Sequence, residues 1–243
     1  MRRIGVRGDE VMLLAVVLML LSHTGVAAPS PGSANTENRN KKISQQNTVV
    51  VIGASYAKGW KMSPLAGMQV INKGVGGEQT HEMLARFEKD VIEAAPRAVI
   101  IWGHINDIFR STPEALENKL IRSRENISNM IEKAKHKGIT PILVTEITLP
   151  AGNSWSDRIG GWIGALRGKQ SYQDQVNSHV IEMNQWTRAQ AKAKQLTLLD
   201  FEKVLADKSG RRKPEFATED GTHLNTQAYE ALTDYVQHLN LGI

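Results

Sequence analysis

The chain of 243 residues contains no cysteine, and only 5% of its residues are aromatic. Without cysteine it can form no disulfide framework, no thiolate zinc site and no cysteine nucleophile. Few aromatic residues, against a hydrophobic content of 41%, predict a core that is mostly aliphatic. The length is typical of one α/β domain with short additions.

Motifs that are common in metal and nucleotide sites are also missing. The pair His81-Glu82 is not followed by the second histidine of the His-Glu-x-x-His zinc motif. The glycines of segment 74–77 are not followed by the Gly-Lys-Ser/Thr of a P-loop. We therefore expect neither a metal ion nor a cofactor.

The formal net charge is +5, and Arg2, Arg3 and Arg7 contribute to it near the N-terminus. The other basic residues are interspersed with acidic ones, and no basic stripe carries interleaved aromatic residues. This pattern is typical of a solvated, mildly basic surface rather than of a nucleic-acid interface. We expect no nucleic-acid partner.

The first 28 residues have the layout of a targeting segment. Arginines come first, an apolar run covers 11–21, and small residues occupy 25–28. The run is shorter than the roughly 20 residues of a membrane-spanning helix but matches the ~7–15 residues of a signal-peptide core. We predict a signal peptide over residues 1–28 and a periplasmic or secreted protein without stable membrane insertion. Cleavage after Ala27 is favoured because Pro29 disfavours cleavage after Ala28.

The alternative to cleavage is an uncleaved N-terminal anchor. A lipoprotein anchor is excluded, because it needs a cysteine after the apolar run and the chain has none. Residues 29–47 are rich in Ser, Asn, Gln, Lys and Pro and have little to bury, which predicts a disordered linker. The folded domain is expected to span residues 48–243.

Within this domain, short apolar runs alternate with helical patterns. The apolar runs predict five strands, at 49–52, 68–71, 98–102, 142–145 and 196–199. Apolar residues at helical spacing predict helices at 80–94, 113–137, 171–194 and 225–238. The alternation indicates an α/β fold with a parallel sheet covered by helices on both faces. In such sheets, sites lie beyond the carboxyl ends of the strands.

Chemistry-bearing residues follow the first three strands and precede the last helix. Ser55 comes directly after the first strand, Gly77 ends a glycine-rich turn after the second, and Asn106 follows the third. Asp220 and His223 stand three residues apart before the final helix. A serine hydroxyl needs a base to become a nucleophile, and a histidine oriented by an aspartate is such a base.

These residues also supply what acyl transfer needs for the negative charge that develops on the substrate oxygen. Backbone N–H groups at Ser55 and in the glycine turn can donate two hydrogen bonds, and the side-chain amide of Asn106 can donate a third. The competing lipase motif Gly-x-Ser-x-Gly does not fit, because Ala57 stands where its second glycine belongs.

Taken together, the four segments resemble the sequence blocks of the SGNH/GDSL hydrolases, in the same order, over about residues 48–238. The resemblance implies a three-layer α/β/α sandwich with a flavodoxin-like, parallel five-stranded sheet and a metal-free serine esterase activity. It makes Ser55, Asp220 and His223 the expected catalytic triad. Ser55, Gly77 and Asn106 are then the expected donors of the oxyanion hole.

Two positions depart from the family pattern. The first block usually has aspartate before the serine, where this chain has Ala54, and we expect a changed loop with retained chemistry. The third block usually reads Gly-x-Asn-Asp, but here Gly103 lies one residue further away and His104 takes the place of the glycine. Asn106 is therefore expected either to donate to the oxyanion or only to cap a turn. His104 has either a packing or a catalytic role.

The expected activity is hydrolysis of carboxyl esters through an acyl-enzyme, with a small-molecule or glycan ester as substrate. O-acetylated cell-wall or extracellular glycans are the favoured class. The alternatives are lipid esters or thioesters, acyl transfer to a sugar, and a non-catalytic module that binds a glycan or partner. The segment 149–168, with Trp155 and Trp162, is expected to be either a lid or binding loop or a hydrophobic anchor that holds the loop to the body.

Overall fold

The computed structural model describes residues 47–62, 64–150 and 172–243, all within one compact unit, Arg39–Ile243. Its centre is a single sheet of five parallel strands in the order β2-β1-β3-β4-β5. The strands are β1 (Thr48–Gly53), β2 (Gln69–Gly74), β3 (Ala98–Trp102), β4 (Thr140–Val144) and β5 (Thr197–Leu199). The predicted parallel five-stranded sheet is confirmed.

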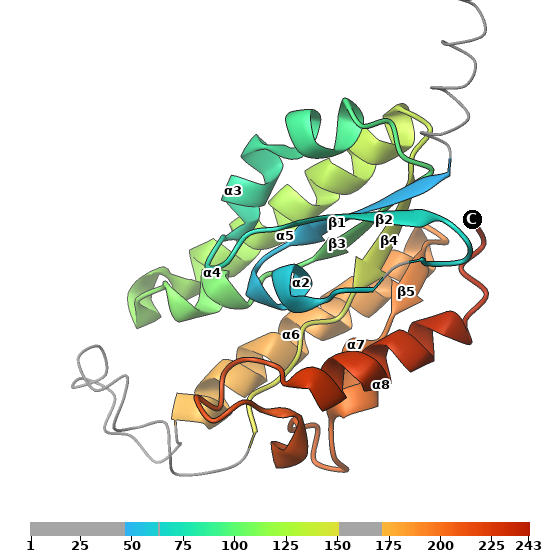
Figure 1. Ribbon diagram of the computed structural model, residues 1–243. Helices are drawn as coiled ribbons and strands as arrows, with labels where there is room; N and C mark the ends of the chain where they lie inside the picture. Colours follow the sequence, from blue (N-terminus) through green and yellow to red (C-terminus); the bar gives the residue numbers. More distant parts are fainter. Residues whose placement is uncertain (1–46, 63, 151–171) are drawn as a thin grey trace, which may run out of the picture. The chain divides into compact units, whose positions relative to one another are not determined.

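Helices cover both faces of the sheet (Figure 1). Right-handed crossovers place α3 (Thr80–Ala85), α5 (Pro113–His136) and α6 (Tyr172–Ala193) on one face. The other face carries α2 (Ser55–Gly59) and α8 (Thr226–Gln237), which are joined by a hydrogen bond from Trp60 to Thr233. Shorter helices include α4 (Ile105–Phe109), α7 (Phe201–Leu205) and the 3₁₀ helix η3 (Pro214–Phe216). These are the layers of the expected three-layer sandwich.

The central strands are buried along their whole length, as their continuous apolar runs predict. Every residue of β1 and of β3 is buried, whereas β2, at the edge of the sheet, is exposed or half-buried throughout. The register pairs Gly53 with Gly74 and with Trp102. The carboxyl ends of β2, β1 and β3 therefore lie level, and the residues that follow them meet at one edge.

Two predicted elements differ from the structure by more than two residues at one end. Strand β2 runs on to Gly74 because Asn72–Gly74 remain in register with the end of β1. The helix predicted over 80–94 is divided into α3 and a π-helical turn, η1 (Glu88–Ile92). In η1 the N–H of Glu93 donates to the carbonyl of Glu88, five residues back, which widens the turn.

The few aromatic residues gather at one place in the core. The rings of Trp60, Trp102 and Phe201 pack edge to face, with centroids 4.9 to 5.9 Å apart. The ring of Tyr56 lies 6.0 Å from that of Trp102. The core is mostly aliphatic elsewhere, as expected, with Phe87 a buried exception, but it is aromatic below the carboxyl ends of β1 and β3. Rigid rings thus support the edge of the sheet at which Ser55 lies.

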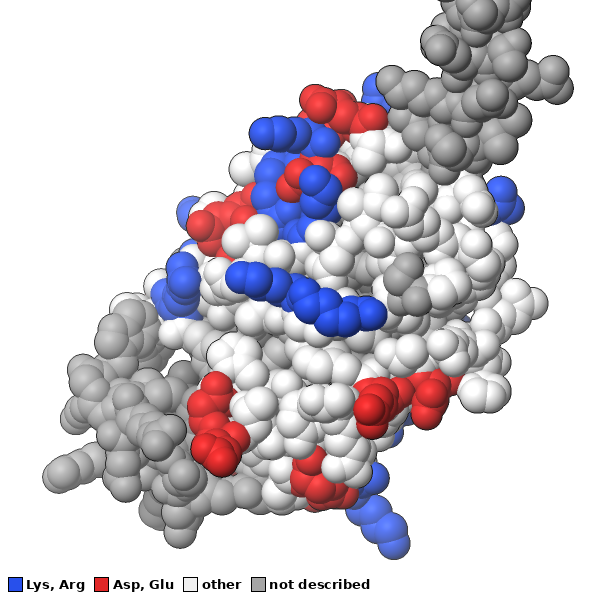
Figure 2. All heavy atoms as spheres, viewed as in Figure 1, with Lys and Arg blue, Asp and Glu red and all other residues white. Residues whose placement is uncertain are grey.

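On the face shown in Figure 2, charges of both signs are mixed above and acidic side chains lie below. The ion pairs of the protein include those of Asp90 with Lys73 and with Arg86. None of the helices in the described ranges is long and apolar enough to cross a membrane. The predicted signal peptide, the predicted linker up to residue 46, and Trp155 and Trp162 lie outside the described residues.

Candidate active site

The loop before α8 holds a close pair of ionisable side chains. His223 Nδ1 lies 2.6 Å from Asp220 Oδ2. The other carboxylate oxygen, Oδ1, accepts the backbone N–H groups of Thr222, at 2.7 Å, and of His223, at 3.0 Å. It also accepts the hydroxyl of Thr218, at 2.7 Å. Gly221, with φ of +70°, makes the left-handed turn that folds the loop back on the carboxylate.

These contacts fix the ionisation state of Asp220. Burial alone would raise the pKa of its carboxyl, but the hydrogen bonds from His223, Thr218 and Thr222 outweigh burial and hold this pKa well below its usual range. An ionised carboxylate only accepts hydrogen bonds, so the proton between the two side chains lies on Nδ1 of His223. In the neutral imidazole with this proton on Nδ1, Nε2 has no proton and can accept one.

Ser55 is the first residue of α2, directly after β1. Its neighbour Tyr56 donates its hydroxyl to the carbonyl of Thr222 at 2.7 Å, and the Tyr56 ring meets the His223 ring edge to face at 6.5 Å. The structure thus brings the serine and the Asp-x-x-His loop to the same edge of the sheet. No hydrogen bond joins Ser55 to His223 among the described residues, and nucleophile–base contacts are often longer without substrate.

Strand β2 holds the helix that carries Ser55. The side-chain amide of Asn72 donates to the carbonyls of Ala57, at 2.7 Å, and of Trp60, at 2.8 Å. These carbonyls lie at the C-terminal end of α2, where helix carbonyls lack partners within the helix. A side chain on the edge strand therefore anchors this five-residue helix.

Asn106, at the start of α4, joins the second and third blocks. Its side-chain amide donates one hydrogen bond, at 2.9 Å, to the carbonyl of Glu78, the residue after Gly77. Gly77 has φ of +80°, which favours glycine, and its backbone N–H makes no hydrogen bond within the described ranges. The two predicted donors therefore lie on adjoining loops at the sheet edge.

The departure in the third block does not remove Asn106 from the site. Gly103 has φ of +155°, and a Cβ there would lie 3.3 Å from the sulfur of Met83 and 3.4 Å from the backbone N of Ala54. This glycine therefore fits the tight space between β1 and α3. The following Asp107 is buried and accepts both the backbone N–H and the hydroxyl of Thr80, so it ties α4 to the start of α3.

For His104 the sequence allows either a packing or a catalytic role. The residue is buried, with 2% of its surface exposed. Burial, with the nearby charge of Arg124, lowers the pKa of its imidazole to about 3. The ring is therefore neutral at neutral pH and has no access to substrate. Its backbone N–H donates to the carboxylate of Glu146, and the burial of the ring favours a packing role.

Residues 51–231 match the GDSL-like lipase/acylhydrolase family. The chain belongs to this family. The resemblance to the SGNH/GDSL hydrolases is thereby confirmed, and so is the expectation of an ester-hydrolysing enzyme, since acylhydrolases are enzymes of that class.

Curated relatives of this GDSL protein match over short stretches. The uncharacterized lipoprotein YqeF of Bacillus subtilis is 32% identical over 93 residues, which are 38% of each chain. The acetylxylan esterase of Geobacillus stearothermophilus is 43% identical over 47 residues, 19% of this chain and 22% of the esterase. The matches thus span well under half the length of these relatives.

Solved structures agree with the GDSL fold over most of the chain. A GDSL-like lipase from Bacteroides thetaiotaomicron has a TM-score of 0.62 at 20% identity, covering 85% of this chain and 94% of the other. A catalytic mutant of the G. stearothermophilus acetylxylan esterase has a TM-score of 0.54 at 17% identity, covering 80% and 95%. At these identities the likeness shows the fold, which confirms the predicted class.

The GDSL site contains buried polar residues that sequence reasoning missed. Glu146, after β4, accepts the backbone N–H groups of His104 and Ile147, and burial raises the pKa of its carboxyl. The side-chain amide of Asn184, on α6, accepts the backbone N–H of Glu146 and donates to the carbonyl of the same residue. A buried Arg212 contacts the Asp-x-x-His loop. No local pattern marks these residues, since each lies far in sequence from what it supports.

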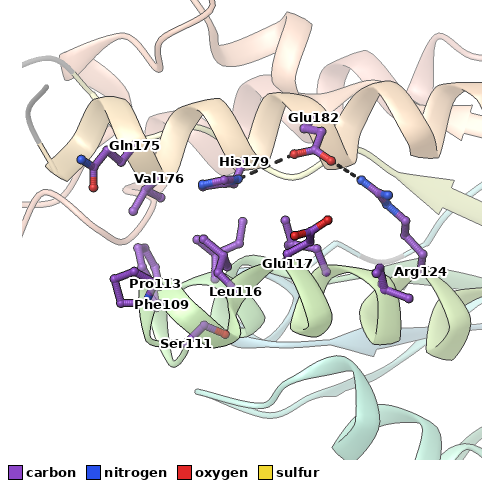
Figure 3. A pocket seen from close by; sticks show the side chains of 13 residues that line it. Phe109, Ser111, Pro113, Leu116, Glu117, Arg124, Gln175, Val176, His179 and Glu182 are labelled. Carbon is purple, nitrogen blue, oxygen red and sulfur yellow. Dashed lines mark hydrogen bonds and ion pairs between the residues drawn. The ribbon is translucent and has the colours of Figure 1, made fainter.

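A cavity lies away from the predicted triad. Its volume is about 630 Å³, and it opens between the N-terminal halves of α5 and α6. In Figure 3, Phe109, Leu116 and Val176 line it, and Glu182 pairs with Arg124 and His179 at one end. None of the predicted site residues lines this cavity.

Within the described ranges, no three His, Cys, Asp or Glu side chains form a group that could hold a metal ion.

Proposed function

We propose that the protein is a serine carboxyl-ester hydrolase that works through an acyl-enzyme, with Ser55 as nucleophile, His223 as base and Asp220 as the group that orients His223. The observation that carries the proposal is the 2.6 Å contact between Asp220 Oδ2 and His223 Nδ1. It leaves Nε2 of His223 free to accept a proton, on a loop hydrogen-bonded to the neighbour of Ser55.

In the first half of the reaction, Ser55 Oγ attacks the ester carbonyl carbon while its proton passes to His223 Nε2. The tetrahedral oxyanion accepts hydrogen bonds from the backbone N–H groups of Ser55 and Gly77 and from the Asn106 amide. The C–O bond to the alcohol then breaks, and the leaving oxygen takes the proton from His223. The acyl group remains on Ser55.

In the second half, water attacks the acyl-enzyme and gives a proton to His223. The new tetrahedral intermediate breaks the bond to Ser55 Oγ, which takes this proton back, and the carboxylic acid leaves. Asp220 stabilises the imidazolium in both halves and keeps its own charge. Its lowered pKa is consistent with that role.

For the substrate, we propose an O-acetyl ester of an extracellular or cell-wall glycan, met by a protein exported through its N-terminal segment. The local match to an acetylxylan esterase supports this class.

The proposal that the protein is exported rests on the basic start and short apolar core of residues 1–28. Because the chain has no cysteine, a thiol-linked lipid anchor is not available to it. Sequencing of the exported protein should give a mature N-terminus near Ala28, and an N-terminus at Met1 would favour the uncleaved anchor.

The nucleophile is tested by labelling with a fluorophosphonate, which reacts with activated serines. The wild type should be labelled and should hydrolyse p-nitrophenyl acetate. Ser55→Ala should lose labelling and several orders of magnitude of kcat, because triad members act as a unit. Ser178→Ala, at an exposed serine of α6, is the matched control and should behave as wild type. An unlabelled wild type would favour a non-catalytic binding module, and an active Ser55→Ala would refute the mechanism.

The substrate class is tested by comparing kcat/KM for acetylated xylan, p-nitrophenyl acetate and p-nitrophenyl palmitate. Acetyl esters should be preferred. A preference for the long-chain ester would instead indicate a lipid ester or thioester hydrolase. Mass spectrometry of reactions with added sugars should show free acetate, whereas acylated sugar would indicate acyl transfer.

A further inference from the structure

Arg212 is a fully buried arginine, 0% exposed, in the segment between α7 and η3. Its sequence neighbours Arg211 and Lys213 are partly exposed. The run of three basic residues therefore hides one guanidinium inside the protein. The local backbone fixes its position, because Lys213 donates to the carbonyl of Leu205 at 2.9 Å and Asp207 to that of Arg211 at 2.8 Å.

The guanidinium is directed at the backbone of the Asp-x-x-His loop. Nη2 donates to the carbonyl of Gly221 at 2.5 Å. Nη1 donates to the carbonyls of Thr222, at 3.0 Å, and His223, at 3.4 Å. One planar guanidinium thus donates to three consecutive carbonyls on the inner side of the loop. The side chains of Asp220 and His223, on the same loop, are about half exposed.

This burial is costly for stability. No carboxylate forms an ion pair with Arg212 in the part of the chain described, and its Nε–H is buried without a hydrogen-bond partner. A buried charge with only neutral acceptors carries a large desolvation cost, and apolar replacements of buried charges are often as stable. The position of the guanidinium therefore points to a role other than stability.

Tyr56 links this arrangement to the serine. Its hydroxyl shares the Thr222 carbonyl with Arg212, and burial raises the pKa of this hydroxyl to about 12, so it remains a donor at neutral pH. Its own carbonyl accepts the hydroxyl of Tyr229 on α8 at 3.1 Å. The carbonyl of Thr222, the residue before His223, thus binds both Arg212 and Tyr56, the residue after Ser55.

We propose that Arg212 is the positioning residue that sets the orientation of Asp220 and His223 relative to Ser55. The inference rests on the proposed hydrolase function. By binding the carbonyls of residues 221–223 on the inner side, the guanidinium turns the loop so that both side chains face outward, toward Ser55. A lysine cannot replace it, because a single ammonium lacks the rigid fork that reaches carbonyls on both of its nitrogens.

The test compares Arg212→Lys and Arg212→Ala with Met130→Ala. Met130 is fully buried on α5, outside the site, and its truncation leaves a cavity that lowers stability without touching the loop. For each purified variant we would measure Tm, kcat and KM for p-nitrophenyl acetate, and the rate of fluorophosphonate labelling, all below the Tm. Misplaced catalytic groups cost about 10²-fold in rate.

We expect Arg212→Lys and Arg212→Ala to lose about 10²-fold in kcat and in labelling rate, with little change in KM. Met130→Ala should lose stability and keep kcat. Millimolar methylguanidinium should restore part of the kcat of Arg212→Ala and leave Met130→Ala unchanged. Retention of wild-type kcat by a folded Arg212→Lys, with only a lower Tm, would overturn the inference.

Tyr56→Phe decides the case if the Arg212 variants do not fold. It removes one donor to the Thr222 carbonyl and keeps the ring, so the fold should survive. We expect its kcat to fall several-fold with KM unchanged, and an unchanged kcat would overturn the inference. Failure of the hydrolase proposal is distinguishable, since the wild type itself would then neither turn over ester nor react with the fluorophosphonate.

Discussion

The two sides of the candidate active site are built by different means. The sheet side consists of Ser55, Gly77 and Asn106, each following one of the strands β1, β2 and β3 that the register holds level. The loop side consists of residues 218–223, which belong to no helix or strand. Individual polar contacts hold it, from Arg212, Tyr56 and the carboxylate of Asp220. Loss of a single polar contact should thus displace the backbone at the ends of the buried strands β1 and β3 less than the backbone of the loop side.

Among losses of a single hydrogen-bond donor, the largest effect is expected on the sheet side, from Asn106→Ala. Loss of one oxyanion donor typically lowers kcat by about 10²–10³ and leaves KM nearly unchanged, because the donor acts mainly in the transition state. The hydrogen bond of Asn106 to Glu78 is also lost, so Tm must be measured together with kcat and KM.

Asn126→Ala is the matched control, because its amide donates at 3.1 Å to the hydroxyl of Thr80, outside the predicted site. It should lower Tm slightly and leave kcat unchanged. An Asn106→Ala variant that is less stable but fully active would make Asn106 a structural residue and leave the oxyanion hole with two backbone donors.

A smaller effect is expected on the loop side, from Thr218→Val. The substitution removes the hydroxyl donor to Asp220 Oδ1 but keeps the shape of the side chain, and the two backbone donors remain. A hydrogen bond of this kind contributes about 0.5–1.5 kcal/mol, which corresponds to roughly two- to tenfold in kcat. Thr187→Val, on α6, removes a buried hydroxyl away from the loop and should not change kcat. Equal kcat values for both variants would mean that the loop side does not depend on single contacts.

The change at His104, beside the sheet side, should leave kcat unaltered and appear only in stability. Its folded pKa of about 3 lies below its unfolded value of about 6.5. Between these values the unfolded chain takes up a proton that the folded protein does not, so this group makes stability fall as the pH falls from 6.5 toward 3. His104→Gln should remove that contribution.

The measurement is the free energy of unfolding of wild type and His104→Gln at several pH values. The wild type should lose up to about 1.4 kcal/mol per pH unit more than the variant within this window. Glu146 and Asp107, whose pKa values burial raises, contribute with the opposite sign in both proteins and cancel in the difference. Parallel curves would show that His104 is accessible to protons in the folded state.

The sequence predicts the sheet side better than the loop side. Continuous β-branched runs identify the strands, and the rule that sites follow strand ends then brings Ser55, Gly77 and Asn106 together. Spacing places Asp220 and His223 on one turn. It does not reveal that Arg212, in a run of three basic residues, is the buried one, because burial there depends on packing against a loop ten residues away. Short α2 and α4 were also missed, since five residues are too few for a helical period.

The hydrogen bonds of Asn72 have a consequence for inactivation by heat. Strand β2 lies at the edge of the sheet, is nowhere fully buried, and pairs only with β1. Edge segments with few buried contacts open locally at lower free energy than the core. An opening of β2 would release the end of α2 from Asn72 and carry the Gly77 turn away at the same time. Nucleophile and oxyanion donor would be separated together while β1, β3 and β4 stay paired, so thermal inactivation would precede global unfolding.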